Sequence, residues 1–229
     1  MHDDLTQFQG AQPPRRETIH GRYVDLEPID ATDHGDSLFA AVSTAAGIDE
    51  RFRYLPQTPQ TDRGDFDSWI AEAADSSDPL FFAVVDRSTG RVEGRQALMR
   101  IDAANGVMEI GHILWGPALS RTREATEALF LCADLAFSSG FRRFEWKCDD
   151  ANAPSKKAAE RFGFTFEGVF RQHLVYKGRN RDTAWFSIID SEWPALRSAY
   201  EAWLDEANFD ASGAQRQGLR ELIAAARRG

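Results

Sequence analysis

The clearest structural signature in this chain is Arg143-Phe-Glu-Trp-Lys-Cys-Asp-Asp-Ala-Asn-Ala-Pro-Ser-Lys-Lys-Ala-Ala-Glu-Arg-Phe-Gly-Phe164. It predicts a buried strand, a polar turn and a short helix, followed by another strand at Thr165–Gly168. Asn152 is a good N-cap, because its side-chain oxygen can accept from the first free helical N–H groups. Gly163 suits the left-handed residue that ends a helix. Ser155, Ala158, Ala159 and Phe162 follow the i, i+3, i+4, i+7 spacing of the inward face of this helix. The hydroxyl of Ser155 therefore occupies the first position of an otherwise apolar face.

Three short motifs in this region resemble a known family. Asp149-Asp-Ala-Asn-Ala-Pro-Ser155, Ala159-Glu-Arg-Phe-Gly-Phe164 and Glu167-Gly168 are similar to the second half of a GNAT-superfamily N-acetyltransferase. The branch that they resemble includes the ribosomal-protein N-terminal alanine acetyltransferases. The resemblance extends over about residues 22–193. It implies an α/β (α+β) fold, in which a mixed, mostly antiparallel sheet is flanked by helices, and direct transfer of acetyl from acetyl-CoA to a primary amine.

Composition and charge narrow the classes of protein. The 229 residues are 42% hydrophobic, which is ample for one sizeable domain. A net charge of −9 argues against nucleic acid or an anionic membrane as a partner. It suits a cationic amine, and equally a protein that is simply soluble. Cys132, Cys148 and five histidines form neither a disulfide framework nor a zinc motif, so no metal is expected. We find no signal peptide and no apolar run of ~20 residues, so we expect a cytoplasmic protein.

Hydrophobic periodicity and turn residues predict the other elements. Strands are expected at 23–29, 80–85, 92–101, 107–115, 144–147, 166–177 and 183–189. Helices are expected at 35–43, 63–74, 122–139, 194–204 and 215–228. Residues 1–21 are predicted to be a flexible arm, 22–193 the GNAT-like domain, and 194–229 a helical extension packed on it. The last helix leaves room for a homodimer.

The turn before the long helix is the expected phosphate site, because a helix N-terminus offers free N–H donors and partial positive charge. GNAT proteins have Gln/Arg-x-x-Gly-x-Gly/Ala here, and this turn holds the pyrophosphate of acetyl-CoA. Arg123 stands where the family has its first glycine, and a Cβ hinders close approach of a phosphate. Its charge could compensate, although an ordinary helix start with solvated charges would look the same. The implied cofactor-binding residues of this turn are Arg121, Arg123, Glu124, Ala125 and Thr126.

Strand 107–115 is the second candidate. Glu109 shares a face with apolar and glycine neighbours, so its pKa should be raised, and it could take a proton from an ammonium nucleophile directly or through water. A buried structural salt bridge would explain the same carboxylate. His112 lies on the opposite face, where we expect a core histidine. In the resembling family the end of this strand splays from its neighbour and pairs with the pantetheine arm, which implies that role for Leu114 and Trp115.

Asn152 and Ser155 are the third candidate. In the family the asparagine contacts the cofactor, and a hydroxyl on the following helix can protonate the departing thiolate. Many GNAT enzymes use a tyrosine one turn along this helix, but that position is about Ala159 here, which has no proton to donate. The resemblance therefore implies Ser155 as the acid, or as a group that orients a water. Asn152 can serve both as an N-cap and as a cofactor ligand.

His173 is the last catalytic candidate. It shares a predicted face with Arg171 and Val175, and could titrate in the acceptor pocket or simply face solvent. That pocket should be shaped by loops at 52–56 and 178–182. The sequence thus favours an acetyl-CoA-dependent N-acetyltransferase acting on a protein N-terminus or a small amine. The alternatives are a catalytically weak acyl-CoA-binding or regulatory module, and a packing protein that has kept the fold but lost the ligand.

Overall fold

A computed structural model describes residues 5–228 of the chain. One eight-stranded sheet runs in the order β1-β2-β3-β4-β5-β6-β8-β7. Every neighbouring pair is antiparallel except β5 and β6, which are parallel. The strands are β1 (Ile19–His20), β2 (Val24–Pro28), β3 (Leu80–Asp86), β4 (Arg91–Asp102), β5 (Val107–Trp115), β6 (Arg143–Asp149), β7 (Thr165–Tyr176) and β8 (Arg179–Ile189). This is the mixed, mostly antiparallel sheet that the resemblance implies.

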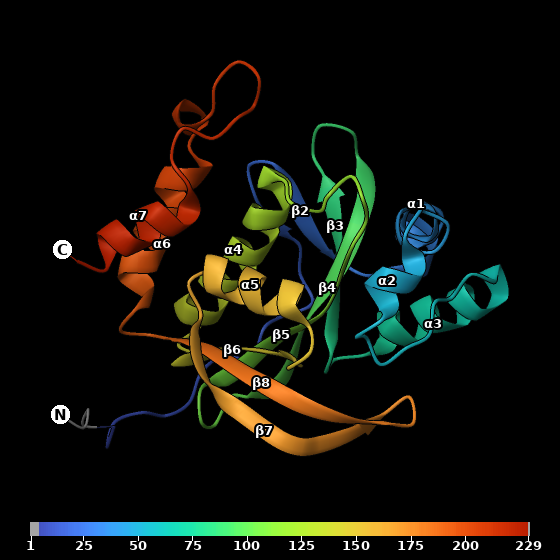
Figure 1. The fold of residues 1–229 in the computed structure, drawn as a ribbon, viewed down its shortest axis with the longest axis horizontal. Helices are drawn as coiled ribbons and strands as arrows, with labels where there is room; N and C mark the ends of the chain where they lie inside the picture. The colour runs from blue at the N-terminus through green and yellow to red at the C-terminus, as the bar shows by residue number, and fades with distance from the viewer. Residues whose placement is uncertain (1–4, 229) are drawn as a thin grey trace.

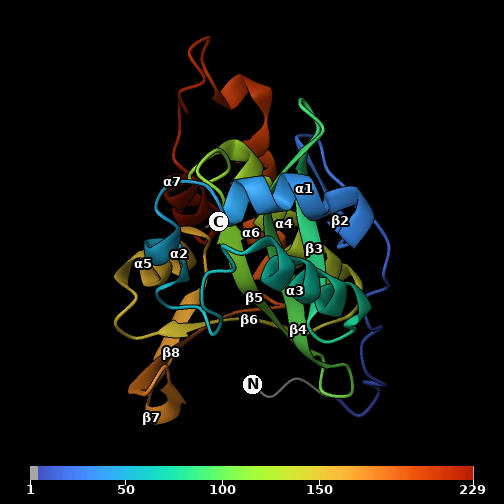
Figure 2. The ribbon, with the colours of Figure 1, turned by 90° about the vertical axis from the view of Figure 1, so that its right-hand side faces the viewer.

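Helices cover both faces of this sheet (Figures 1 and 2). They are α1 (Ala31–Val42), α2 (Ile48–Phe52), α3 (Arg63–Asp75), α4 (Arg123–Ser138), α5 (Ala153–Arg161), α6 (Trp193–Leu204) and α7 (Leu219–Ala226), with a 3-10 turn η1 (Glu206–Asn208). The first three pack over β3 and β4 around one apolar core. The others share a second core on the opposite face, as Figure 1 shows.

An apolar stripe of seven residues at helical spacing, from Ala125 to Phe137 of α4, forms the centre of the larger core. Six of its seven residues are buried in α4: Ala125, Ala128, Leu129, Cys132, Ala133 and Ala136. Cys132 accepts a hydrogen bond from Gln96 Nε2 at 3.2 Å, and burial raises its thiol pKa to about 12. The sulfur is therefore a packing group and is poorly suited to be a nucleophile.

Several predicted boundaries are wrong. The first helix starts at Ala31 because Asp30 caps it, accepting from the N–H groups of Thr32 and Asp33. A short helix, α2, was not predicted and ends at Phe52, where the predicted loop at 52–56 begins. The strand expected from residue 183 begins at Arg179 and meets β7 in a tight hairpin. The last helix begins only at Leu219, because residues 205–218 form an organised loop.

The segment that precedes the domain runs along its surface. Residues 1–4 of the predicted flexible arm lie outside the described chain. The N–H groups of Ala11 and Gln12 donate to the carbonyls of Ala103 and Ser139 at 2.8 and 2.9 Å. At its end, β1 pairs with β2. The C-terminal part of the chain packs on the domain through α6, which lies against α4 with the Phe137 and Trp193 rings stacked 5.0 Å apart.

Candidate active site

Strands β5 and β6 separate halfway along their length. They pair from Val107 and Arg143 as far as Ile110 and Trp146, and no pairing follows beyond that point. Residues 111–115 of β5 remain bonded to β4 on their other edge. The backbone edge that faces β6 is therefore open, as the resemblance implies for this strand. An open edge of N–H and C=O groups can pair with an extended, amide-containing ligand.

A cavity of about 500 Å³ lies beside this opening, and we call it the wedge cavity. Its walls come from β5, β6, α5, the β7–β8 hairpin and the loop after α2. The lining residues used below are Tyr54, Glu109, His112, Trp115, Lys147, Asn152, Ser155, Ala158, His173 and Arg181. Glu109, Asn152, Ser155 and His173, predicted from three separate places in the sequence, thus border one space.

Ser155 is positioned by the turn that was predicted to cap its helix. Asn152 Oδ1 accepts from the Ser155 N–H at 3.1 Å, and Gly163 has φ +88° at the other end of α5. The Trp146 indole N–H donates to Ser155 Oγ at 3.0 Å. The indole uses a lone pair of this oxygen, so the hydroxyl can still donate its own hydrogen. The geometry thus allows Ser155 to act as a proton donor at the wall of the wedge cavity.

Glu109 lies in a charged cluster, and not among purely apolar neighbours. Its side chain is 7% exposed, and its carboxylate lies 3.0 Å from Lys147 Nζ and 3.5 Å from Arg100 Nε. Lys147 also pairs with Glu145 at 2.7 Å and lies 3.8 Å from the centre of the Trp185 ring. Burial raises the Glu109 pKa, and the Lys147 charge opposes this rise. The carboxylate is therefore both a buried ion-pair partner and a lining group of the cavity.

The predicted face of His112 is wrong. Its φ of +50° breaks the alternation of β5, and the pairing with β4 shifts at the same place. The ring consequently lines the wedge cavity together with Glu109, beside Phe81 and with Nδ1 3.4 Å from Gln57 Nε2. Burial, assisted by the charges of Arg95 and Arg100, lowers the His112 pKa to about 4. This imidazole is neutral at pH 7.

A second irregularity moves His173. Gln172 has φ +51°, and the β7–β8 register shifts between Phe170 and Leu174. His173 is therefore half-buried in the wedge cavity, with Nδ1 2.9 Å from Thr183 Oγ1, whereas Val175 is 84% exposed. His173 lies within this bulge of β7, whereas Val175 belongs to the regular pairing with β8 that resumes at Leu174. The predicted shared face of these two residues is therefore wrong, because a bulge breaks the alternation of a strand.

A larger cavity of about 780 Å³ lies at the start of α4, and we call it the helix-start cavity. All five predicted cofactor-binding residues of the phosphate turn line this cavity: Arg121, Arg123, Glu124, Ala125 and Thr126. Thr122 caps the helix, its Oγ1 accepting from the Ala125 N–H at 3.2 Å. Within residues 5–228, the N–H groups of Arg123 and Glu124 donate to no protein acceptor. Such free donors at a helix N-terminus suit an anionic group.

The two cavities adjoin, because Trp115 and Ala158 line both. Trp115 is held by its indole N–H, which donates to Gln96 Oε1 at 3.1 Å. The side chain of Leu114 instead points into the smaller apolar core, so only its backbone can take part in binding. A continuous surface therefore leads from the start of α4, past Trp115, to Ser155.

Comparisons with known proteins match this arrangement. A family model described as an acetyltransferase (GNAT) domain matches residues 24–165, which is more than half of the chain. The chain belongs to the GNAT acetyltransferase family. It is similar to the uncharacterized N-acetyltransferase p20 of Bacillus licheniformis, at 30% identity over 62% of this chain and 81% of that protein.

Solved structures agree with this assignment. The acetyltransferase superimposes on a GCN5-related N-acetyltransferase from Brucella melitensis with a TM-score of 0.94, at 55% identity over 96% of this chain and all of that one. A probable GNAT-family acetyltransferase from Chromobacterium violaceum gives a TM-score of 0.78, at 41% identity over 85% of this chain and 96% of that one. The protein is therefore an N-acetyltransferase, a member of the acyltransferases.

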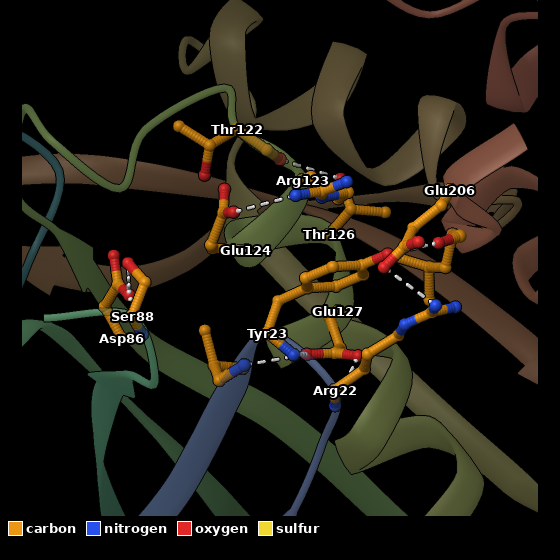
Figure 3. A network of polar contacts seen from close by, with 12 residues as sticks. Arg22, Tyr23, Asp86, Ser88, Thr122, Arg123, Glu124, Thr126, Glu127 and Glu206 are labelled. Atoms are coloured by element: carbon orange, nitrogen blue, oxygen red, sulfur yellow. Dashed lines mark hydrogen bonds and ion pairs between the residues drawn. The ribbon is translucent and has the colours of Figure 1, made fainter. Parts of the chain in front are cut away.

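Arg123 does not have the surroundings that were predicted. In this acetyltransferase its guanidinium lies 3.8 Å from the centre of the Tyr23 ring and 3.9 Å from the Glu124 carboxylate (Figure 3). It also lies 5.0 Å from the centre of the Phe209 ring. It is therefore half-buried between two aromatic residues far away in sequence. The interpretation as a solvated helix start is wrong, and contact with a phosphate is not its only available role.

The sequence reasoning missed two cations of the site. Lys147 was read only as a strand residue, and Arg161 only as part of the Glu-Arg-Phe-Gly motif. A lysine inside a buried strand, and an arginine one residue before a buried phenylalanine, were the available signals. In residues 5–228, no group of three His, Cys, Asp or Glu side chains is arranged to hold a metal ion. None of the helices described there has the length and apolar character that a bilayer span requires.

Proposed function

We propose that this protein transfers the acetyl group of acetyl-CoA directly to a primary amine. The observation that carries the proposal is the continuity of the two cavities past Trp115 and Ala158. The helix-start cavity suits the phosphates, because free N–H donors and the positive end of the α4 dipole face it. The open edge of β5 suits the amide-containing pantetheine arm, and the wedge cavity suits the thioester and the acceptor.

The groups around the wedge cavity divide the proton transfers between them. The neutral amine attacks the thioester carbonyl carbon, so that a C–N bond forms as the C–S bond breaks. Glu109, whose pKa is raised by burial, accepts the proton from the amine nitrogen, directly or through a water. Ser155 gives a proton to the departing thiolate or orients a water that does so. Unpaired backbone groups of residues 111–115 can polarise the carbonyl.

The acceptor enters beneath two cross-links that narrow the mouth of the wedge cavity. Tyr54 Oη donates to the Ala151 carbonyl at 3.1 Å, and Lys177 Nζ donates to the Phe52 carbonyl at 3.0 Å. These contacts tie the loop after α2 to the β6–α5 turn and to the β7–β8 hairpin. A small amine, or the end of an extended peptide, fits beneath them better than a folded protein surface does.

A thermal-shift titration with acetyl-CoA tests the cofactor, with dephospho-CoA and ATP as controls. At about 100 times its Kd, a ligand of the native state should add ~2.7 kcal/mol to the stability. A panel of peptide α-amines and small amines, followed by release of free thiol, then tests the chemistry. Tight acetyl-CoA binding without acetylation of any amine would favour a regulatory acyl-CoA-binding module. No thermal shift at saturating acetyl-CoA would reject both the acetyltransferase and the acyl-CoA-binding module.

A further inference from the structure

The residues between α6 and α7 form an organised loop, and we call Asp205–Gln217 the C-terminal loop. Asn208 is buried at its centre, and its Nδ2 donates to the carbonyls of Trp203 and Gln217 at 3.1 and 3.2 Å. The Gln217 N–H donates back to Asn208 Oδ1 at 3.0 Å, and Phe209 pairs with Gln215 through an isolated bridge. The loop lies outside residues 24–165, which the family model matches.

Three contacts link this loop and the preceding end of α6 to residues 22–23 and to Arg123 at the start of α4, and Figure 3 shows the first of them, between Arg22 and Glu206. Arg22 pairs with Glu206 at 2.8 Å, and Tyr23 Oη donates to the Leu204 carbonyl at 2.9 Å. Arg123 lies between the rings of Tyr23 and Phe209. The arginine that replaces the family's glycine thus links the phosphate turn to the C-terminal loop.

The docked loop supplies one wall of the helix-start cavity. Phe209, Gly213 and Gln215 line it, together with Trp203 at the end of α6. The Trp203 indole N–H donates to Gln215 Oε1 at 2.8 Å, and the Phe209 ring meets the indole edge-on at 5.2 Å. The opposite wall is the phosphate turn. Without the loop, the start of α4 would face open solvent on this side.

Arg161 contributes an unneutralised charge to the same cavity. Its Nη1 donates to Thr126 Oγ1 at 3.2 Å, and its guanidinium lies 5.1 Å from the ring centres of Phe162 and Trp203. Among residues 5–228, no carboxylate forms an ion pair with it. Burial lowers its pKa, so the protein alone disfavours this charge. A half-buried cation without a counter-ion is costly, and a bound anion would offset that cost.

We propose that the C-terminal loop is a functional part of the cofactor site, and that it binds the adenosine phosphate end of coenzyme A together with Arg161. Arg161 contacts a phosphate oxygen, and Phe209 and Trp203 provide the apolar surface for the adenosine. Arg123 is a positioning residue, which holds the loop in place and does not bind the phosphate. This inference rests on the proposed function, because it assumes that acetyl-CoA is the donor.

The test compares donors that share the thioester but differ at the adenosine end. Calorimetry would measure the affinities of acetyl-CoA, acetyl-dephospho-CoA and acetyl-phosphopantetheine for the full-length protein, for Arg161→Gln and for Phe209→Leu. Arg220→Gln is the matched control, because Arg220 pairs with Glu160 on α5 and does not line the cavity. We expect Arg161→Gln to reduce the preference for acetyl-CoA over acetyl-phosphopantetheine at least tenfold. Phe209→Leu should reduce it severalfold, and Arg220→Gln should leave it unchanged.

Other outcomes would overturn the inference in distinguishable ways. If acetyl-CoA binds but both variants keep the wild-type preference, or lose both donors equally, the loop is only structural. If the wild type binds none of the three donors, the proposed function fails as well. If Arg161→Gln weakens the binding of acetyl-dephospho-CoA as much as that of acetyl-CoA, Arg161 contacts the pyrophosphate. If it weakens the binding of acetyl-CoA alone, Arg161 contacts the 3′-phosphate. Should Arg161→Gln not fold, Arg161→Met removes the charge but keeps an unbranched apolar stem against Phe162 and Trp203, and together with Phe209→Leu it provides the same comparison.

Discussion

The indole Nε1 of Trp146 donates a hydrogen bond to Oγ of Ser155 at 3.0 Å. This contact ties the last residue of β6 that pairs with β5 to the first turn of α5, at the point where β5 and β6 separate. It fixes the serine oxygen against the cavity wall and leaves the hydroxyl hydrogen to act as a donor.

Replacement of this hydroxyl should therefore affect turnover more than binding. Ser155→Ala is expected to lower kcat by at least ~10-fold, within the usual range for loss of a general acid, and to change the acetyl-CoA Kd little. Ser155→Thr retains a hydroxyl and should recover part of the rate. Steady-state kinetics and calorimetry check both values. Unchanged kcat in Ser155→Ala would remove this serine from the proton transfer.

The buried carboxylate of Glu109 should shape the pH–rate profile. Because burial raises its pKa, the rate should rise with pH as this group loses its proton, and Glu109→Gln should flatten that limb. Glu145→Gln is the control, because Glu145 shares the Lys147 partner but does not line the wedge cavity. It should keep the limb while losing comparable stability. If both variants keep the wild-type profile, Glu109 is only an ion-pair partner.

His112 should make the folded state sensitive to acid. Its pKa is lowered from 6.5 to about 4, so between these pH values the unfolded chain binds a proton that the folded chain does not. Stability should therefore fall as the pH drops through this window, by at most ~3 kcal/mol. Urea unfolding at pH 7 and pH 5 should show a smaller difference for His112→Gln than for the wild type. His20→Gln, on exposed β1, should behave like the wild type; an equal loss in all three proteins would contradict this prediction.

Glu127 anchors the entry to the domain. Its buried carboxylate accepts from the backbone N–H groups of Arg22, Tyr23 and Val24 at 2.9, 2.6 and 2.8 Å. Glu127→Gln keeps the shape but puts an NH₂ donor opposite N–H donors, so we expect a loss of ~2–3 kcal/mol in unfolding free energy. Asp134 lies on the same helix as Glu127, α4, and forms a half-exposed ion pair with Arg197 of α6. Asp134→Asn breaks this pair and should lower the unfolding free energy by no more than ~1 kcal/mol. Denaturant titration compares them, and equal losses would argue against a special role for Glu127.

Local pattern was sufficient for most of the architecture. The strand, turn and helix around Asn152, the exact span of β5 and the buried stripe of α4 were all predictable, because strand and helix periods are read from neighbouring residues. The same periodicity brought Glu109 forward as a candidate, whereas the family resemblance implied the roles of Asn152, Ser155 and the phosphate turn. Their common location around two adjoining cavities then followed from the sheet order.

Tertiary contacts decided the rest. Neither His112 nor Gln172 is a glycine, so their left-handed conformations have no local signal, yet they determine which side chains enter the wedge cavity. The pairing of Glu109 with Lys147, and the burial of Arg123 between Tyr23 and Phe209, join segments that are far apart in the chain. The periodicity of the sequence indicates which way a side chain points within its own helix or strand. Its partners and its charge state depend on what the folded chain places opposite it.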